Sequence, residues 1–318
     1  MPRRSALLGG TDYPLGGGPV DPPPGSITHG IDIRNANGGN VGLLVATTTT
    51  HNGFLYDSAG AFAGHSISGN GAAGSPYVID RRRYTSDVRI RNTAGVYAKF
   101  TNCRFEGDPG IPTPGGSAFV WVEDTGAFVE ITDSTLTTAG GPTTATNPPG
   151  GGCDKGFLSY VPFTLRRCDI SMAAVLCGFE IGRTESASLV EDCYMHNVWS
   201  NAGDHTDIIN GNFHASHVTV RRCWLDGIRT GDTYVVNGFG IYDDPADSTG
   251  IIEDWTISSN YVERCQTVFL SNTSTSRFLA PFVVTDNIIG DFNLQLSSMR
   301  LPTSQSANRR ADGTPVIF

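Results

Sequence analysis

The clearest structural signal lies in residues 190–227, which read VEDCYMHNVWSNAGDHTDIINGNFHASHVTVRRCWLDG. This stretch contains two copies of one pattern, VEDCYM at 190–195 and VRRCWL at 220–225. In each copy an apolar residue is followed three positions later by a cysteine, and two positions after that by another apolar residue. Between the copies lies DHTDIIN at 204–210, which is rich in side chains that can do chemistry. The copies predict a repeated structural unit, and the segment between them is the first candidate for a functional site.

The same core recurs along most of the chain. It has the form apolar-x-apolar, two further residues, a small marker residue, x and apolar. The markers are Cys103, Ser134, Cys168, Cys193, Cys223, Asn260 and Asn287. Their spacing varies between 25 and 37 residues. A constant core with loops of variable length is typical of a parallel β-helix, in which each coil can extend outward at low entropic cost.

Alternation within the core gives the direction of individual side chains. It predicts that Val218 and Val220 point inward and that Thr219 points outward. The three-residue step from Val220 to Cys223 breaks the alternation, so we expect a corner there. The cysteines at 168, 193 and 223 then share one row on successive coils. We expect stacked buried thiols in this row, with disulfide bonds as the alternative.

The rest of the chain divides around this repeat. Residues 1–27 are rich in glycine and proline, and we expect an attachment arm there, with a flexible terminus as the alternative. Residues 28–76 contain short apolar runs that are expected to form cap strands over the open end of the stack. We expect the β-helix over 77–294 and a C-terminal tail over 295–318. The predicted fold is therefore an all-β, single-stranded parallel β-helix.

Charge and hydropathy exclude several classes of function. The net charge of −9 and the pI of about 5.2 argue against a nucleic-acid partner, which would need a basic surface. Apolar runs stay shorter than the roughly 18–20 residues of a membrane helix, so membrane insertion is not expected. The first ten residues lack the apolar run of a signal peptide. We therefore expect synthesis in a cytoplasm, where cysteines stay reduced.

Candidate functional residues lie in the 204–210 segment and in the coils on either side of it. The candidate acids and bases are Asp207, His205, Glu180, Asp243 and Asp244. The candidate sugar-binding residues are Asn210, Arg183, Tyr242, Trp199 and Trp224. Paired carboxylates can act as acid and base in glycoside hydrolysis. Carboxylates that hold Ca²⁺, with an arginine as base, would suit a lyase; no other cofactor and no structural metal is expected. The alternative is that these residues only stabilise turns and pack the outer face.

Residues from about 77 to 287 resemble right-handed parallel β-helix proteins of the pectate-lyase-like type, particularly those of actinobacteria and their tailed phages. The corresponding motifs are VEDCYM at 190–195, HTDIIN at 205–210 and HVTVRRCWL at 217–225. The second motif often reads HNDGIQ in that family, and this chain differs at Thr206, Ile208 and Asn210.

The resemblance implies a phage minor tail protein, that is, a tail fibre or tailspike component located in the virion. Its β-helix would present a surface for binding host polysaccharide during adsorption, and residues 1–27 would join other tail proteins. A homotrimer is implied by the resemblance alone. The alternative function within the same superfamily is that of a polysaccharide lyase or glycoside hydrolase.

Overall fold

A computed structural model of the protein describes a repetitive all-strand chain. The described residues are 48–49, 54–55, 72–80, 83–84, 88–90, 97–107, 118–122, 128–138, 153–179, 187–199, 206–212, 215–228, 236–242, 252–271, 281–290, 292–297 and 304–318. No helix occurs among them, and so none of them forms an apolar helix that could span a membrane. The predicted arm, residues 1–27, lies outside this part of the chain.

The strands form three sheets, in which all pairing is parallel. Sheet 1 contains β3 (Tyr77–Asp80), β6 (Tyr97–Thr101), β9 (Phe128–Thr132), β12 (Phe163–Arg166), β15 (Ser188–Glu191), β18 (Val218–Arg221), β21 (Trp255–Ser258), β24 (Phe282–Thr285) and β27 (Ser304–Ser306). Sheet 2 contains β1 (Thr48–Thr49), β4 (Arg83–Tyr84), β7 (Arg104–Gly107), β10 (Thr135–Thr138), β13 (Asp169–Ser171), β16 (Tyr194–His196), β19 (Trp224–Asp226), β22 (Tyr261–Glu263), β25 (Ile288–Ile289) and β28 (Arg309–Arg310). Sheet 3 contains β2 (Phe54–Leu55), β5 (Val88–Ile90), β8 (Ala118–Val122), β11 (Cys153–Ser159), β14 (Ala173–Phe179), β17 (Thr206–Asn212), β20 (Val236–Tyr242), β23 (Cys265–Ser271) and β26 (Phe292–Ser297).

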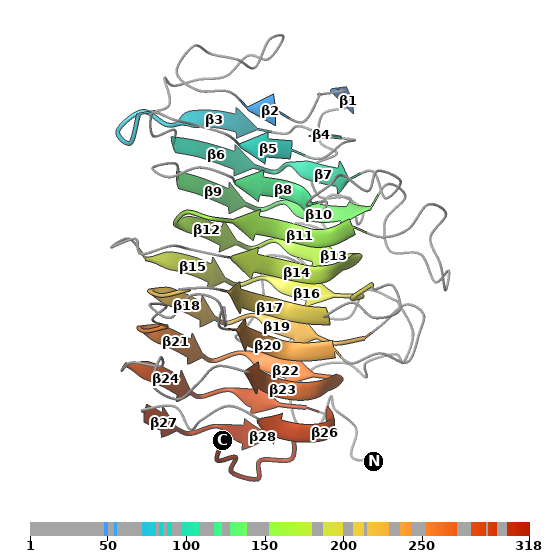
Figure 1. Ribbon diagram of the computed structural model, residues 1–318, viewed down its shortest axis with the longest axis vertical. Coiled ribbons are helices and arrows are strands. Elements are labelled where there is room, and N and C mark those ends of the chain that lie inside the picture. The colour runs from blue at the N-terminus through green and yellow to red at the C-terminus, as the bar shows by residue number, and fades with distance from the viewer. Residues whose placement is uncertain are drawn as a thin grey trace.

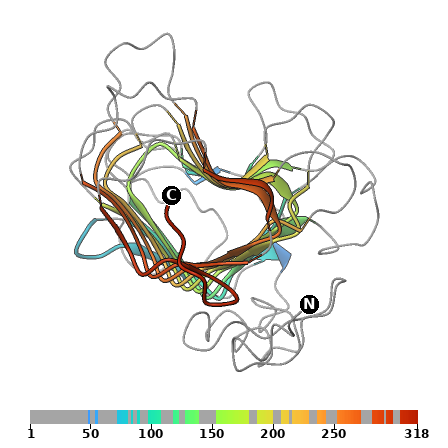
Figure 2. The same cartoon turned by 90° about the horizontal axis from the view of Figure 1, so that it is seen from below.

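Each coil visits sheets 1, 2 and 3 in turn, so every strand pairs with the strand three places along the chain. The coils are stacked along the long axis of the molecule (Figure 1). Viewed along that axis, the three sheets enclose one continuous interior (Figure 2). This is the parallel β-helix predicted from the repeat, and the fold prediction is confirmed.

A residue with positive φ forms the corner between sheets 1 and 2 in each coil from β6 onward. These residues are Asn102, Asp133, Arg167, Asp192, Arg222, Ser259, Asp286 and Ala307, with φ between 53° and 58°. Each immediately precedes the marker position of its coil. Half of them are Asn or Asp, the non-glycine residues that adopt this conformation most readily. Because this left-handed residue is inserted between the end of one strand and the marker, the marker points inward three positions after the last inward residue instead of two. This explains the three-residue step in the sequence.

The marker residues form a buried row along the interior, as predicted. Cys223 N–H donates to Asn260 Oδ1 at 2.9 Å, and Asn260 N–H donates to Asn287 Oδ1 at 3.0 Å. The cysteines of the row carry free thiols. Burial raises the pKa of Cys168 and of Cys223, which keeps both thiols protonated. The row thus satisfies backbone donors at the corner with small side chains.

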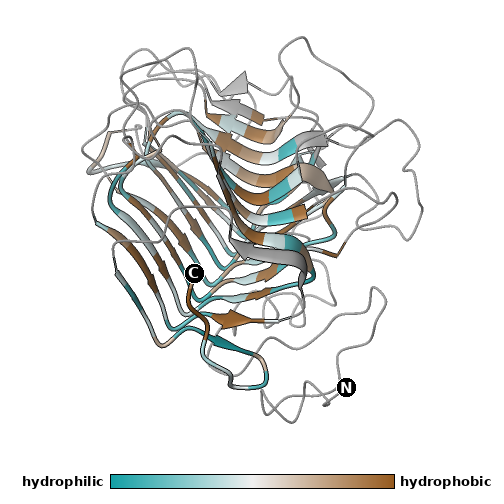
Figure 3. Ribbon diagram, turned by 60° about the horizontal axis from the view of Figure 1, so that its bottom comes forward, coloured by the Kyte–Doolittle hydropathy of each residue, from teal (hydrophilic) through white to brown (hydrophobic). Residues whose placement is uncertain are grey.

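Side-chain direction along the strands follows the predicted alternation. Val218 and Val220 are buried, whereas Thr219 and Arg221 are half-buried on the outer face. Hydrophobic and hydrophilic residues accordingly alternate along many of the strands (Figure 3). The interior is one apolar core that extends through the described coils from Tyr77 to Phe318.

The stack continues beyond residue 294, into the segment for which the sequence predicted a tail. Strands β27 and β28 pair with β24 and β25, and Asn308 extends the marker row by one coil. Residues 311–318 then fold back over the end. Phe318 N–H donates to Gln305 Oε1 at 2.9 Å, and Val316 and Phe318 are each 7% exposed. The segment therefore forms the last coil and its cap.

Candidate functional site

The structure describes half of the residues that the sequence predicted for a functional site. The described ones are Asp207, Asn210, Tyr242, Trp199 and Trp224. His205, Glu180, Arg183, Asp243 and Asp244 lie outside the described residues.

Asp207 lies on the outer face of sheet 3, at an irregular point in β17. Ile208 and Ile209 follow it, and both belong to the hydrophobic core. Two consecutive inward residues break the strand alternation. Asp207 and Asn210 therefore lie on the outer side, where Asn210 Nδ2 donates to Asp207 Oδ2 at 2.6 Å. In a straight strand, side chains three residues apart would point to opposite faces, so the local bend creates this contact.

The next coil supplies two more donors to the same carboxylate. Asn237 and Tyr242 both lie on β20, and Asn237 is directly in register with Asp207. Asn237 Nδ2 donates to Asp207 Oδ1 at 2.8 Å, and the Tyr242 hydroxyl donates to the same oxygen at 3.1 Å. We call Asp207, Asn210, Asn237 and Tyr242 the Asp207 cluster. It is assembled from two successive coils and so depends on the stacking of the β-helix.

Gly240 makes room for the carboxylate. It is in register with Asn210, and a Cβ atom at this position would lie 2.5 Å from the Asp207 carboxyl group. Gly178, in the same row two coils before Gly240, would bring a Cβ no closer than 3.3 Å to its neighbours. The absence of a side chain at Gly240 therefore leaves room for the Asp207 carboxylate to pack against β20.

The cluster is buried but not fully satisfied. Asp207 is 0% exposed, Asn237 3% and Asn210 5%. Asn237 Oδ1 is buried and has no hydrogen-bond partner. An unpaired buried acceptor costs about 1–3 kcal/mol. Native folds keep few such groups, and each one calls for a partner such as an ordered water, an ion or a ligand.

The electrostatics of the cluster keep Tyr242 protonated. Burial raises the pKa of Tyr242, and the nearby charge of Asp207 raises it further. Its phenol is therefore a hydrogen-bond donor at neutral pH. The described cluster thus combines one carboxylate, two amides and one phenol, which suits recognition of polar, hydroxyl-bearing molecules.

The two tryptophans do not present a face to a ligand. Trp199 is 3% exposed and Trp224 is 0% exposed. Trp224 packs between Tyr194 and Tyr261 on the outer side of sheet 2, with ring centroids 4.7 and 6.1 Å away. Its Nε1 donates to Glu263 Oε1 at 3.2 Å. A sugar platform needs an open aromatic face, so this stack corresponds to the packing alternative.

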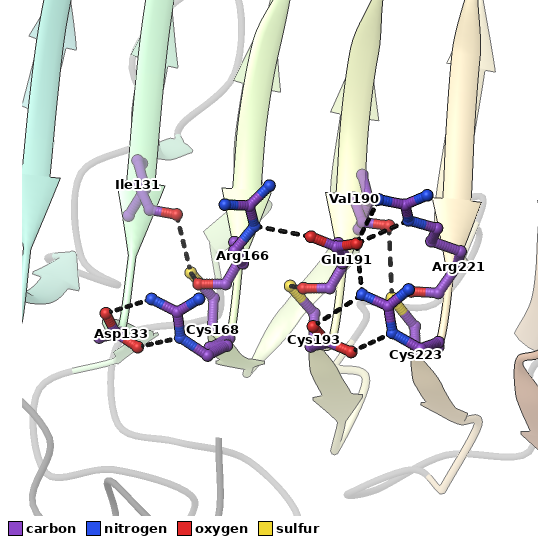
Figure 4. A network of polar contacts seen from close by, with 12 residues as sticks. Ile131, Asp133, Arg166, Cys168, Val190, Glu191, Cys193, Arg221 and Cys223 are labelled. Atoms are coloured by element: carbon purple, nitrogen blue, oxygen red, sulfur yellow. Dashed lines mark hydrogen bonds and ion pairs between the residues drawn. The ribbon is translucent and has the colours of Figure 1, made fainter. Parts of the chain in front are cut away.

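A second buried acid, Glu191, lies on the outer face of sheet 1 and has arginine partners on both neighbouring coils (Figure 4). Arg221 Nε donates to Glu191 Oε1 at 2.6 Å, and Arg222 also donates to that oxygen. Arg166 Nε lies 2.6 Å from Oε2 as an ion pair, although its N–H direction does not meet hydrogen-bond geometry. Burial opposes ionisation of Glu191, but Arg222 and Arg221 outweigh it and lower the pKa. We call Glu191 and its three arginines the Glu191 cluster.

The described residues contain no group of three or more His, Cys, Asp or Glu side chains arranged to hold a metal ion. Ca²⁺ takes six to eight oxygen ligands. The members of the Asp207 cluster offer one carboxylate, two amide oxygens and one phenol oxygen. These residues by themselves do not make the calcium site that a lyase would need.

Asn237 and Gly240 were not among the predicted site residues. A signal for Asn237 was nevertheless present, because it lies as far beyond Cys223 as Asp207 lies beyond Cys193. Extending the register from the marker row would have placed the two side chains on adjacent rungs. For Gly240 no such signal exists, since its importance depends on where the Asp207 carboxylate lies.

Comparisons of the chain with protein-family models, with curated proteins and with solved structures gave no match in any of the three.

Proposed function

We propose that the protein is a phage minor tail protein, a tail fibre or tailspike component, that binds host surface polysaccharide through the outer face of sheet 3. The observation that carries the proposal is the Asp207 cluster, where two coils gather hydrogen-bonding groups around a buried, unpaired acceptor. Sites for polar ligands are built from a few such convergent groups. Stacked coils also repeat the surface about every 4.8 Å, which suits an extended sugar chain.

The described residues favour binding over hydrolysis. Glycosidases use two carboxyl groups about 5–9.5 Å apart. The described cluster supplies one, that of Asp207, and Tyr242 is held in its protonated form. A polysaccharide lyase or glycoside hydrolase is the alternative, and it would draw its second group from Glu180, Asp243 or Asp244.

The tail assignment is supported by the resemblance of residues 77–287 to β-helix proteins of tailed phages and by the Gly/Pro-rich composition of residues 1–27. In this proposal the protein is made in the host cytoplasm and incorporated into the virion. Residues 1–27 bind other tail proteins, and three copies assemble.

The binding proposal is tested with purified protein on an array of glucan, mannan, galactan, arabinogalactan, chitin oligosaccharides and a polyuronate. We expect retention on at least one of these glycans and no release of reducing ends or unsaturated products. Retention on none contradicts the proposal. Product release that Asp207→Ala abolishes in a folded protein would establish the enzymatic alternative.

The tail proposal is tested separately, by mass spectrometry of purified virions of the phage that encodes the chain. We expect the full-length protein in the particles and the variant lacking residues 2–27 to be absent from them. Normal incorporation of the truncated protein would contradict the anchoring role of the arm.

A further inference from the structure

The side-chain amide of Asn237 uses its nitrogen in a hydrogen bond, whereas its oxygen has no hydrogen-bond partner. Nδ2 donates to Asp207 Oδ1 at 2.8 Å. Oδ1 is buried without a hydrogen-bond partner, in a residue that is 3% exposed. An amide in a folded interior normally uses both ends, because each lost water must be replaced.

The orientation of this amide follows from its surroundings. Rotating it by half a turn would bring Oδ1 against the Asp207 carboxylate, so that two acceptors would face each other. The contact from Nδ2 to Asp207 therefore assigns the nitrogen and the oxygen. The unpaired acceptor is a consequence of the fold and not of an arbitrary choice between two equivalent orientations.

The backbone holds Asn237 in place. It lies within β20, in register with Asp207 on the preceding coil and with Thr267 on the following one. A strand paired on both sides cannot shift easily to find another donor for Oδ1. The side chain is thus pre-organised, with its free acceptor beside the carboxylate of the Asp207 cluster.

We infer that Asn237 Oδ1 accepts a hydrogen bond from a donor group of the bound glycan, either a sugar hydroxyl or an acetamido N–H. This inference rests on the proposed function and names the residue that selects the ligand. A sugar with a free donor at this position completes the pairing, whereas a sugar that presents an ether or ester oxygen there leaves two acceptors in contact.

The test compares three variants on the glycan of the array that the wild-type protein retains. Asn237→Leu removes the acceptor and the bond from Nδ2. Tyr242→Phe removes a different donor to the same Asp207 oxygen and keeps Asn237 intact. Thr256→Val alters the outer face of sheet 1. We expect Asn237→Leu to weaken affinity roughly tenfold, Tyr242→Phe to weaken it less, and Thr256→Val to leave it unchanged.

Each outcome has a distinct meaning. If the wild-type protein binds no glycan, the proposed function fails. If it binds, but Asn237→Leu binds equally well or loses no more affinity than Tyr242→Phe, the inference fails and the proposed function stands. Chitin oligosaccharides and glucan oligosaccharides as separate ligands distinguish the N–H donor from the hydroxyl donor.

A crystal structure of the wild-type protein with a bound oligosaccharide provides a measurement that does not depend on the folding of a variant. We expect a nitrogen or oxygen donor of the sugar within about 3.2 Å of Asn237 Oδ1. A protein-bound water at Oδ1, with the sugar elsewhere, would overturn the inference.

Discussion

Two buried acids on the outer surface of the β-helix, Glu191 and Asp207, are held in different ways. The described partners of Glu191 are arginines, which tie it to the neighbouring coils. The described partners of Asp207 are the amides of Asn210 and Asn237 and the phenol of Tyr242.

The difference lies in what each partner brings with it. A guanidinium group has donors only, so it pairs with a carboxylate without adding an acceptor. An amide that donates to a carboxylate also brings an oxygen, and that oxygen needs a donor of its own. The Glu191 cluster therefore serves as a staple between coils, whereas the Asp207 cluster is left with an unpaired acceptor at Asn237. The following predictions, ordered by size, test whether this distinction between staple and site holds.

The largest expected difference is in glycan affinity between variants that replace Asp207 and Glu191. We expect Asp207→Ala to weaken glycan binding on the order of a hundredfold, because Asn210, Asn237 and Tyr242 lose the acceptor that orients them. Glu191→Ala should bind with the affinity of the wild-type protein. Affinities are measured by titration calorimetry, with circular dichroism as the control for folding. Equal losses of glycan affinity in Asp207→Ala and Glu191→Ala would contradict the distinction between the two clusters.

Stability tests whether Glu191 links the neighbouring coils. We expect Glu191→Ala to lower the free energy of unfolding by about 2 kcal/mol, because Arg166 and Arg221 lose their shared counter-charge while Arg222 keeps Asp192. This loss of stability is smaller than for a fully buried ion pair, because the side chains of Arg166 and Arg221 are 35% and 42% exposed. Urea denaturation measures it, and a change below about 0.5 kcal/mol would contradict the role of a staple.

Gly178 and Gly240, on the two strands that flank β17, offer a matched pair of variants. Gly240→Ala would place a Cβ 2.5 Å from the Asp207 carboxyl group, whereas Gly178→Ala meets its nearest neighbour at 3.3 Å. We expect the first variant to weaken glycan binding about fivefold by displacing the carboxylate, and the second to stay within about twofold of wild type. The same calorimetric titration checks both, and indistinguishable affinities would refute the positioning role of Gly240.

The smallest effect concerns pH. The pKa of Glu191 is lowered in the folded protein relative to 4.5, so its ionisation stabilises the fold above that pH. This contribution disappears as the pH falls through the folded pKa. We expect the melting-temperature difference between wild type and Glu191→Gln to be full above about pH 5 and to shrink below about pH 4.5. A difference that grows on acidification would contradict this assignment.

The last coil shows why part of the fold escaped sequence analysis. Strand β27 reads Ser304-Gln305-Ser306, so it lacks the apolar-x-apolar core that marks the other coils. Gln305 stands in register with Val284 and hydrogen bonds to the backbone of Phe318. The apolar contacts at this end come instead from Val316 and Phe318, which fold back as a cap. A pattern search cannot find a coil whose apolar side chains lie outside the repeat.

The Asp207 cluster could be predicted from the sequence only in part. Asp207 and Asn210 could be named because they lie in the polar segment between the two repeat copies, and Tyr242 because it lies in a neighbouring coil. The sequence left sugar binding and packing both open for the two tryptophans, because it does not say what covers the outer face of a sheet. Their burial is a property of the folded surroundings.

The sequence by itself determined the coil. A repeated apolar core and a small marker residue at each corner are local signals, and alternation converts them directly into inward and outward rows. Only the tertiary structure decided what the outward residues do. Whether an acid such as Glu191 or Asp207 meets arginines or amides depends on which side chains the neighbouring coils bring beside it. That depends on register and on local bends such as the one at Ile208 and Ile209, which no single coil encodes.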